Sequence, residues 1–272
     1  MIKRSLITMW LLGSFFLGEI RAQVEPMSAT GRASANWAYT TTGIQSSFSN
    51  QAGLANLQGF SASVYAEQTH LLPEFKNIGL SLGIGTGVNS GLSLNFTSYG
   101  IEEFRQNRVG LGYGMNLSND FQLGVQIDWY QTSITQYGEN SQLSFRLGGI
   151  YRIFSDLSLG VHISNPLGLE ISENHPIPSL FNFDLAWRIS SQLTVGAGMV
   201  KDIDHKAGVK GALHYDIHPN FTLMMGALSN PTKLSFGVAF SFGDFGLQSA
   251  ATYHQYLGFS PAAGFSYERK ND

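Results

Sequence analysis

The sequence contains no cysteine and few charged residues, and each shortage excludes a class of protein. Without cysteine, the chain cannot be one of the small exported scaffolds that disulfides hold together. Charged residues make up 13% of the chain, well below the usual fraction of about a quarter. A soluble exported domain would carry more surface charge, and the net charge of -3 provides no basic surface for nucleic acid.

Long apolar runs are missing as well. Residues 1–22 have the pattern of a signal peptide, with Lys3 and Arg4, an apolar stretch over residues 6–17 and the small residue Ala22 at its end. That stretch is shorter than the ~20 residues of a membrane-spanning helix, and no later stretch reaches this length without polar interruption. We therefore predict an exported chain whose mature part begins at Gln23 and contains no transmembrane helix.

What the sequence has instead is alternation. In residues 77–86, the apolar residues Ile78, Leu80, Leu82 and Ile84 are separated by glycine or serine. Successive side chains of a β-strand point to opposite faces, so this period of two predicts a strand with one apolar face. Such blocks recur between turn residues, and no long stretch has helical periodicity. They predict fourteen strands around residues 60–64, 77–86, 92–96, 109–115, 123–129, 143–147, 157–163, 181–187, 193–199, 207–215, 221–225, 234–242, 245–253 and 261–267.

The predicted connections alternate in length. Short turns are expected at residues 89–91, 118–120, 155–156, 190–192, 218–220 and 243–244, and longer links at 70–76, 100–106, 132–139 and 165–178. Outer-membrane barrels have short periplasmic turns, longer external loops and aromatic girdles at both interfaces. Trp129, Phe221 and Tyr267 lie near predicted strand ends, as such girdles require.

The sequence therefore predicts an all-β, antiparallel transmembrane barrel of about fourteen strands in the bacterial outer membrane. The barrel is expected over residues 57–267, followed by a tail at residues 268–272. The alternative is a soluble β-sandwich or a lipocalin-like barrel. It is disfavoured because little else in the chain remains to cover fourteen apolar faces.

If the apolar faces contact lipid, the opposite faces line the lumen, and these carry charges of both signs. Asp128 and Arg146 lie on consecutive predicted strands, and Asp184 and Arg188 lie on one face of a single strand, so we expect ion pairs inside the lumen. A charge-lined permeation path is the alternative. The polar residues expected on the lumenal faces are Glu67, Arg108, Asp128, Arg146, Arg152, His162, Asp184, Arg188, Lys206, Lys210, His214, Asp216 and His254. The candidate site residues among them are Arg108, Asp128, Arg146, Asp184, Arg188, Lys210 and His214.

The lumenal faces are also rich in glycine. Glycine on a strand often marks the close approach of another backbone. The glycines in question are Gly110, Gly112, Gly114, Gly124, Gly148, Gly160, Gly196, Gly198, Gly208, Gly226, Gly237 and Gly264. We predict that residues 23–56, which precede the first strand, fold back into the lumen as a plug.

Two short motifs in this N-terminal segment carry a resemblance. They are Gly-Arg-Ala-Ser-Ala at residues 31–35 and Phe-Ser-Asn-Gln-Ala-Gly-Leu-Ala at residues 48–55. They resemble the N-terminal signature of the FadL-like outer-membrane barrels, in particular the PorV and PorQ branch of the Bacteroidota, although Gln51 stands where proline is usual. The resemblance implies a fourteen-stranded barrel with its N-terminus inside. The residues that match this plug motif are Gly31, Arg32, Phe48, Asn50, Ala52, Gly53 and Leu54.

No catalytic, metal or cofactor site emerges from the sequence. The seven histidines lack ligand spacings such as His-Glu-x-x-His. His162 and Ser164 share a predicted strand face, but the sequence offers no third member of a hydrolytic triad. We therefore predict a non-enzymatic protein without a cofactor.

Three functions remain open. The PorV-like motifs and short loops favour an accessory subunit of a larger outer-membrane secretion or assembly complex of the type IX kind. The alternative is a FadL-like transporter of hydrophobic small molecules, which requires an apolar path past Trp37, Tyr39 and Phe48. A passive porin-like barrel is disfavoured by the predicted plug. The expected partners are outer-membrane lipid, other outer-membrane proteins and, for a transporter, a hydrophobic small ligand.

Overall fold

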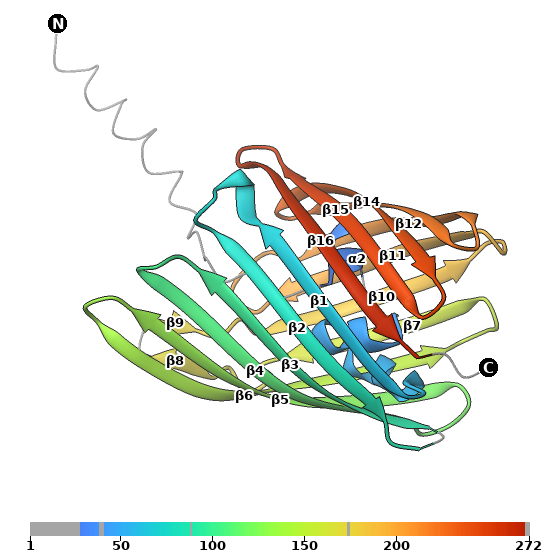
Figure 1. Cartoon of the computed structure of the whole chain (residues 1–272), viewed down its shortest axis with the longest axis horizontal. Coiled ribbons are helices and arrows are strands. Elements are labelled where there is room, and N and C mark those ends of the chain that lie inside the picture. The colour runs from blue at the N-terminus through green and yellow to red at the C-terminus, as the bar shows by residue number, and fades with distance from the viewer. Residues whose placement is uncertain (1–27, 38–40, 88, 173–174, 270–272) are drawn as a thin grey trace, which may run out of the picture.

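The computed structural model describes residues 28–37, 41–87, 89–172 and 175–269, which form a β-barrel around short helical segments (Figure 1). The predicted signal peptide, Tyr39 and the last three residues of the predicted tail lie outside the described residues. The helical segments are α2 (Ala29–Ala33), η1 (Ile44–Phe48), η2 (Gln51–Asn56) and η3 (Thr69–Leu71).

Fourteen strands of the described chain close into the barrel, which confirms the predicted architecture. Each is antiparallel to its neighbours, and β1 closes the sheet on β16, with Val64 opposite both Leu80 of β2 and Phe265 of β16. The strands are β1 (Phe60–Gln68), β2 (Lys76–Gly85), β3 (Ser90–Gly100), β4 (Phe104–Asn116), β5 (Phe121–Ile134), β6 (Gly138–Arg152), β7 (Leu157–Ser164), β10 (Leu180–Arg188), β11 (Leu193–Asp202), β12 (Gly208–His218), β13 (Phe221–Ser229), β14 (Thr232–Phe242), β15 (Phe245–His254) and β16 (Gly258–Glu268). β8 (Glu170–Ser172) and β9 (His175–Pro176) form a separate hairpin.

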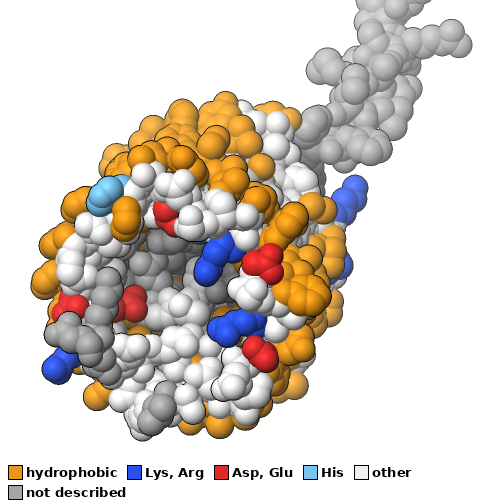
Figure 2. Space-filling model, turned by 90° about the vertical axis from the view of Figure 1, so that its right-hand side faces the viewer, with side chains coloured by type: hydrophobic (Ala, Val, Ile, Leu, Met, Phe, Trp, Pro, Cys, Tyr) orange, Lys and Arg blue, Asp and Glu red, His pale blue; other side chains and the backbone are white. Residues whose placement is uncertain are grey.

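The strands have the two faces that the alternation predicts. On β2, Leu80 and Leu82 are 44% and 40% exposed on the outside, whereas Ser81 between them is fully buried in the interior. Figure 2 shows apolar side chains over the outside of the barrel and a hollow at one end with charged and other polar groups around it. The exposed apolar belt is the surface that a transmembrane barrel presents to lipid. None of the helices in the described ranges has the length and apolar character needed to cross a bilayer.

The two ends of the barrel differ in their connections. At the end that we call the turn end, short turns such as residues 243–244 join the strands, and β1 begins and β16 ends there. At the opposite end, which we call the loop end, the longest connections are residues 69–75 and 165–179. This alternation follows the short periplasmic and longer external connections of outer-membrane barrels.

Two of the predicted long links are wrong. β5 and β6 continue through most of residues 132–139 and leave only residues 135–137 as a turn, in which Tyr137 N donates to Ile134 O at 2.9 Å. Residues 100–106 likewise shrink to a link at 101–103. The polar composition of these stretches indicated loops, but beyond the apolar belt a strand needs no apolar face, so polar residues extend the hairpins.

We expect Leu111→Arg to weaken assembly of the barrel in a bilayer. Leu111 lies in the middle of β4, is 57% exposed, and stands between Leu94 and Ile127 on the outer face. Arginine at the midplane of a membrane barrel costs about 2–4 kcal/mol. Urea unfolding from lipid vesicles measures this loss, and Tyr137→Arg, in a loop-end turn, is the control that keeps wild-type stability. Equal stability of the two variants would contradict the assignment of this face to lipid.

Candidate functional site

The candidate site is the lumen together with the described N-terminal residues 28–37 and 41–57, which we call the inner segment. Its α2 packs on β13–β16 and its η2 on β3–β6, so the inner segment contacts two different parts of the wall. Figure 1 shows these blue elements inside the barrel. Most of its side chains are buried, including Ala33, Phe48 and Leu54 at 0% exposure.

Glycines in the wall make room for the inner segment. A Cβ atom added to Gly124 of β5 would overlap the backbone of Gln51 and Ala52, and one added to Gly226 of β13 would overlap the backbone of Ser34. Gly114, Gly148, Gly196, Gly237 and Gly264 likewise face atoms of the inner segment. The predicted close backbone approach is therefore found at Gly114, Gly124 and Gly226, with the inner segment as the partner. Gly110, Gly198 and Gly208 instead face atoms of the wall itself.

The motif residues lie in the tightest part of this packing. Asn50 caps η2, because its side chain accepts a hydrogen bond from Ala52 N, and its Nδ2 donates to Gly149 O at 3.1 Å and Val161 O at 3.2 Å. A Cβ at Gly53 would overlap Thr41 O. Leu54 packs with Ile44 and Leu57, so the second motif joins η1 and η2 into one unit.

The first motif anchors α2 to β1 by a buried ion pair. Arg32 Nε donates to Glu67 Oε2 at 2.8 Å, and Tyr65 Oη donates to the same oxygen at 2.7 Å. Burial lowers the pKa of Arg32, but the Glu67 carboxylate and Tyr65 raise it above its ordinary value. Arg32 is therefore charged, and Glu67 is its counter-ion.

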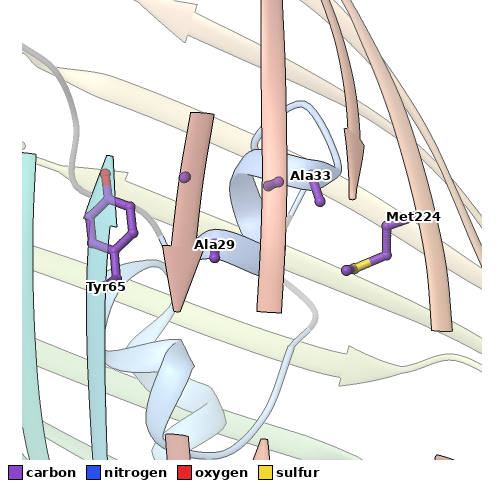
Figure 3. Packing of buried hydrophobic residues seen from close by; sticks show 6 residues of the cluster. Ala29, Ala33, Tyr65 and Met224 are labelled. Atoms are coloured by element: carbon purple, nitrogen blue, oxygen red, sulfur yellow. The ribbon is translucent and has the colours of Figure 1, made fainter. Parts of the chain in front are cut away.

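Small residues bring α2 against the wall on the same side. Figure 3 shows Ala29 and Ala33 of α2 between Tyr65 and Met224, with Ala250 and Ala262 completing the cluster. Alanine allows the helix to approach the strands closely, so α2 is held by packing as well as by the Arg32–Glu67 pair.

Past α2, the inner segment is held by polar contacts to β10 and β12. His214 Nε2 lies 2.6 Å from Ser34 Oγ, and Trp37 Nε1 donates to Leu185 O at 3.1 Å. Ser34 Oγ donates to Thr30 O at 3.0 Å, so the imidazole donates to Ser34 and does not activate it as a nucleophile. This contact is an anchor. Among the described residues, no group of three His, Cys, Asp or Glu side chains is arranged to hold a metal ion.

Of the two ion pairs predicted in the lumen, the structure contains one and not the other. Arg146 Nε lies 2.7 Å from Asp128 Oδ2, as expected. Asp184 pairs with Lys210 at 2.8 Å and not with Arg188, which is exposed at the turn end of β10. Residues four apart on a strand are separated by roughly 13 Å, too far for an ion pair.

Gly198 explains how Asp184 reaches Lys210. Gly198 of β11 stands opposite Asp184 of β10 on one side and Lys210 of β12 on the other. Without a side chain on Gly198, the two charged groups meet across the intervening strand, and a Cβ there would overlap Asp184 Oδ1. Lys210 Nζ also donates to Asn36 O at 3.2 Å, so this pair contacts the inner segment.

The two ends of the lumen differ. At the turn end, a mainly polar cavity of about 400 Å³ lies between the inner segment and β14–β16, with Gln45, Gln248 and Glu268 in its lining. Figure 2 looks into the hollow at this end. Trp37 and Phe48, which were expected on an apolar path, are 3% and 0% exposed. Passage through the lumen would therefore require the inner segment to move.

At the loop end, described residues of the connection between β7 and β10 pack on the wall, whereas the sequence predicted this connection only as a long link. Ile171 and Ile177 from this connection pack on the inward-facing Tyr130 of β5. Asn165, in the left-handed region at φ 48°, holds the connection in place by donating to Ile177 O at 2.7 Å and Leu169 O at 3.0 Å. Ile171, Ile177 and Tyr130 thus form a buried apolar cluster at the loop end.

We expect Gly124→Val to displace the inner segment without opening the barrel. The valine side chain overlaps the backbone of residues 51–52, and such overpacking costs about 1–3 kcal/mol. Because the chain lacks cysteine, Ala52→Cys reports accessibility to maleimide in both backgrounds. Labelling should accelerate at least about tenfold, the factor that 1.4 kcal/mol gives.

The matched control for this change is Gly149→Val on the adjacent strand β6. A Cβ there has no neighbour closer than 3.6 Å, so labelling of Cys at position 52 should stay slow. Equal labelling rates in the two variants would mean that the inner segment does not depend on the glycine-lined wall.

Known proteins resemble this chain in structure but not in sequence. No protein-family model and no curated protein sequence matches the chain. Among solved structures, a deltaS2S3 mutant of the monoaromatic hydrocarbon channel TodX aligns with a TM-score of 0.72 and 11% identity over 90% of this chain and 100% of that chain. The toluene transporter TodX of P. putida aligns with a TM-score of 0.68 and 12% identity over 92% and 100%. A FadL homologue of Pseudomonas aeruginosa aligns with a TM-score of 0.66 and 10% identity over 90% and 99%.

At these identities the similarity concerns the fold, and the PorV and PorQ branch stays a prediction. The structural neighbours are a hydrocarbon channel, a toluene transporter and a FadL homologue. With its apolar outer belt and fourteen closed strands, the chain is a transmembrane barrel of the outer-membrane type with the fold of the FadL-type channels.

Proposed function

We propose that this protein is a bacterial outer-membrane channel for hydrophobic small molecules and that the inner segment is its gate. The observation that carries the proposal is how the inner segment is held. Its described residues contain no strand, so it contacts the wall through side chains and packing and not through a hydrogen-bonded ladder. Such a segment can shift while the barrel stays closed, because the wall's own hydrogen bonds are untouched.

An apolar patch at the loop end supports hydrophobic cargo. Leu71 and Leu72 in the β1–β2 connection are 55% and 46% exposed, and Tyr256 and Leu257 in the β15–β16 connection are 81% and 51% exposed. The two connections are neighbours, since His70 N donates to Ser260 Oγ at 2.8 Å. We call Leu71, Leu72, Tyr256 and Leu257 the loop-end patch and propose that it first contacts the cargo.

The Arg32–Glu67 pair lies beneath this patch and is the proposed latch. Glu67 is the second-last residue of β1, and η3 with Leu71 follows at once. Cargo that enters between the two connections would disturb the end of β1 and the carboxylate that holds α2. Release of α2 would then free the lumen from its loop end toward the turn-end cavity.

Uptake of toluene tests the proposal directly, in a bacterial host that lacks its own outer-membrane channel for such compounds. Expression of the chain should raise the initial rate of uptake, and replacing Leu71, Leu72 and Leu257 with serine should lower it. Ile203→Ser in the β11–β12 connection, where Ile203 is 62% exposed, is the matched control and should retain the wild-type rate. A rate equal to that of the empty host would refute the channel function.

We expect Glu67→Gln to open the gate. The change leaves Arg32 buried without its counter-ion, and breaking a buried pair from one side costs about 3–5 kcal/mol. Maleimide labelling of Ala33→Cys, which is fully buried in the wild type, measures release of α2 and should become fast.

The double variant Arg32→Met with Glu67→Leu is the control for this prediction. It removes both charges and fills their space with apolar atoms, which often preserves stability at such sites. Labelling of Ala33→Cys should therefore stay slow. Fast labelling in the double variant and slow labelling in Glu67→Gln would reverse the proposed role of the pair.

The second candidate function is an accessory subunit of an outer-membrane secretion or assembly complex. The short loop-end links at residues 101–103, 135–137 and 255–257 favour it, because they leave little material for capturing cargo. Affinity purification in mild detergent distinguishes the candidates: an accessory subunit co-elutes with a larger barrel in fixed stoichiometry, whereas a channel elutes alone.

A further inference from the structure

The charged side chains buried in the described lumen form pairs, with one cation left over. Three pairs account for most of them: Arg32 with Glu67 at 2.8 Å, Lys210 with Asp184 at 2.8 Å, and Arg146 with Asp128 at 2.7 Å. The remaining cation is Arg108 of β4, which is 2% exposed. Within the described chain, no buried carboxylate remains that would belong to Arg108 alone.

Asp128 is only a distant ion-pair partner of Arg108, because both of its carboxylate oxygens accept shorter hydrogen bonds from other side chains. Arg108 Nε lies 3.6 Å from Asp128 Oδ1, beyond hydrogen-bond distance. The same oxygen accepts from Gln126 Nε2 at 2.7 Å, and the other carboxylate oxygen is held by Arg146. Two guanidinium groups therefore share one carboxylate, and the cluster carries an excess positive charge.

The unused polar atoms around Arg108 are donors. Its Nε and Nη1 are buried without a close hydrogen-bond partner in the part of the chain that the structure describes. Its Nη2 reaches Asn95 Oδ1 at 3.5 Å, and the guanidinium also contacts the side chain of Tyr130. Tyr130 Oη accepts from Arg146 Nη2 at 3.3 Å, so its own proton can be donated to another group. Donors beside an unbalanced positive charge select an anion.

The surroundings strengthen that selection. Asn95 and Gln126 are neutral, and Asn95 Nδ2 donates to Gln126 Oε1 at 3.0 Å. Ile171 and Ile177 pack on Tyr130, which is 8% exposed. A buried charge without a counter-ion is strongly unfavourable, and water supplies hydrogen bonds but no charge.

We propose that the lumen holds a small monovalent inorganic anion of chloride size against the unpartnered donors of the Arg108 guanidinium, beside the Tyr130 hydroxyl. The site contributes to folding of the wall at β3–β6 and is independent of what the barrel transports. The anion balances Arg108 in the way that Asp128 balances Arg146 and Asp184 balances Lys210.

Crystals of the full mature chain grown in sodium bromide test the site directly. The expected result is one ordered bromide, identified by anomalous scattering, within hydrogen-bond distance of Arg108 Nη1. A water molecule at this position, or no bound species, overturns the proposal.

Thermal unfolding in detergent provides an independent measurement. At equal ionic strength, the unfolding midpoint in chloride should exceed that in gluconate, because the gluconate anion is too large for the site. The expected difference is about 5 °C when the chloride concentration is well above the dissociation constant. Equal midpoints overturn the proposal.

Two variants and one control make the solution test specific. Asn95→Asp places a carboxylate on Arg108 with almost no change in shape, and Arg108→Met removes the excess charge, so both should lose the difference between chloride and gluconate. Arg152→Met changes an arginine whose side chain is 55% exposed and should keep the difference. If Asn95→Asp still depends on chloride as the wild type does, the anion does not balance Arg108.

Discussion

Every backbone N–H and C=O group in the lipid-facing wall needs a partner within the protein, because the hydrocarbon core of a membrane contains no water to supply one. Pairing of β1 with both β2 and β16 meets this need by removing the free edges of the sheet. The alternation of the side chains follows from closure, since one face of each strand must then contact lipid and the other must contact whatever fills the barrel.

A closed barrel also encloses an interior space that must be filled. Fourteen strands enclose more space than their inward side chains fill when many of these are glycine or serine. The inner segment occupies that space, and glycines such as Gly124 and Gly226 bring its backbone against the strands. The wall thus owes its integrity to its own hydrogen bonds, while the inner segment depends on packing and a few polar contacts. The proposed gate depends on this separation, because a segment held without backbone ladders can shift while the wall keeps its hydrogen bonds.

Charge is the second constraint on the interior. A charged side chain in the lumen is far from bulk water, so each requires a partner at short distance. Gly198 lets Asp184 and Lys210 meet across an intervening strand, and Glu67 meets Arg32 only because α2 lies against β1. The arrangement couples the inner segment to the wall through Arg32 and through the contact of Lys210 with Asn36. Electrostatics and packing therefore act together on α2, and the Lys210–Asn36 contact attaches the inner segment at a second point.

Much of this structure was predictable because the pattern of a membrane-barrel strand depends only on residues that are close together in the sequence. The period of two in residues 77–86 reports the same alternation wherever the strand lies in the sheet, so the strand count and the lipid-facing residues followed from the sequence. The wall glycines predicted a close backbone neighbour, because a strand residue without a side chain leaves room for one. Polar stretches were harder to interpret, as residues 132–139 demonstrate, because a hairpin in water and a loop have similar compositions.

The sequence by itself determined which residues face lipid, how many strands there are and that the lumenal faces are rich in glycine, since these properties depend only on neighbours along the chain. The tertiary structure decided which charges pair, as in the choice of Lys210 over Arg188 by Asp184, and how the connection at residues 165–179 folds over Tyr130. It also decided that Arg108 lacks a carboxylate of its own. These outcomes depend on distances between strands that closure and register set, and no pattern along a single strand contains those distances.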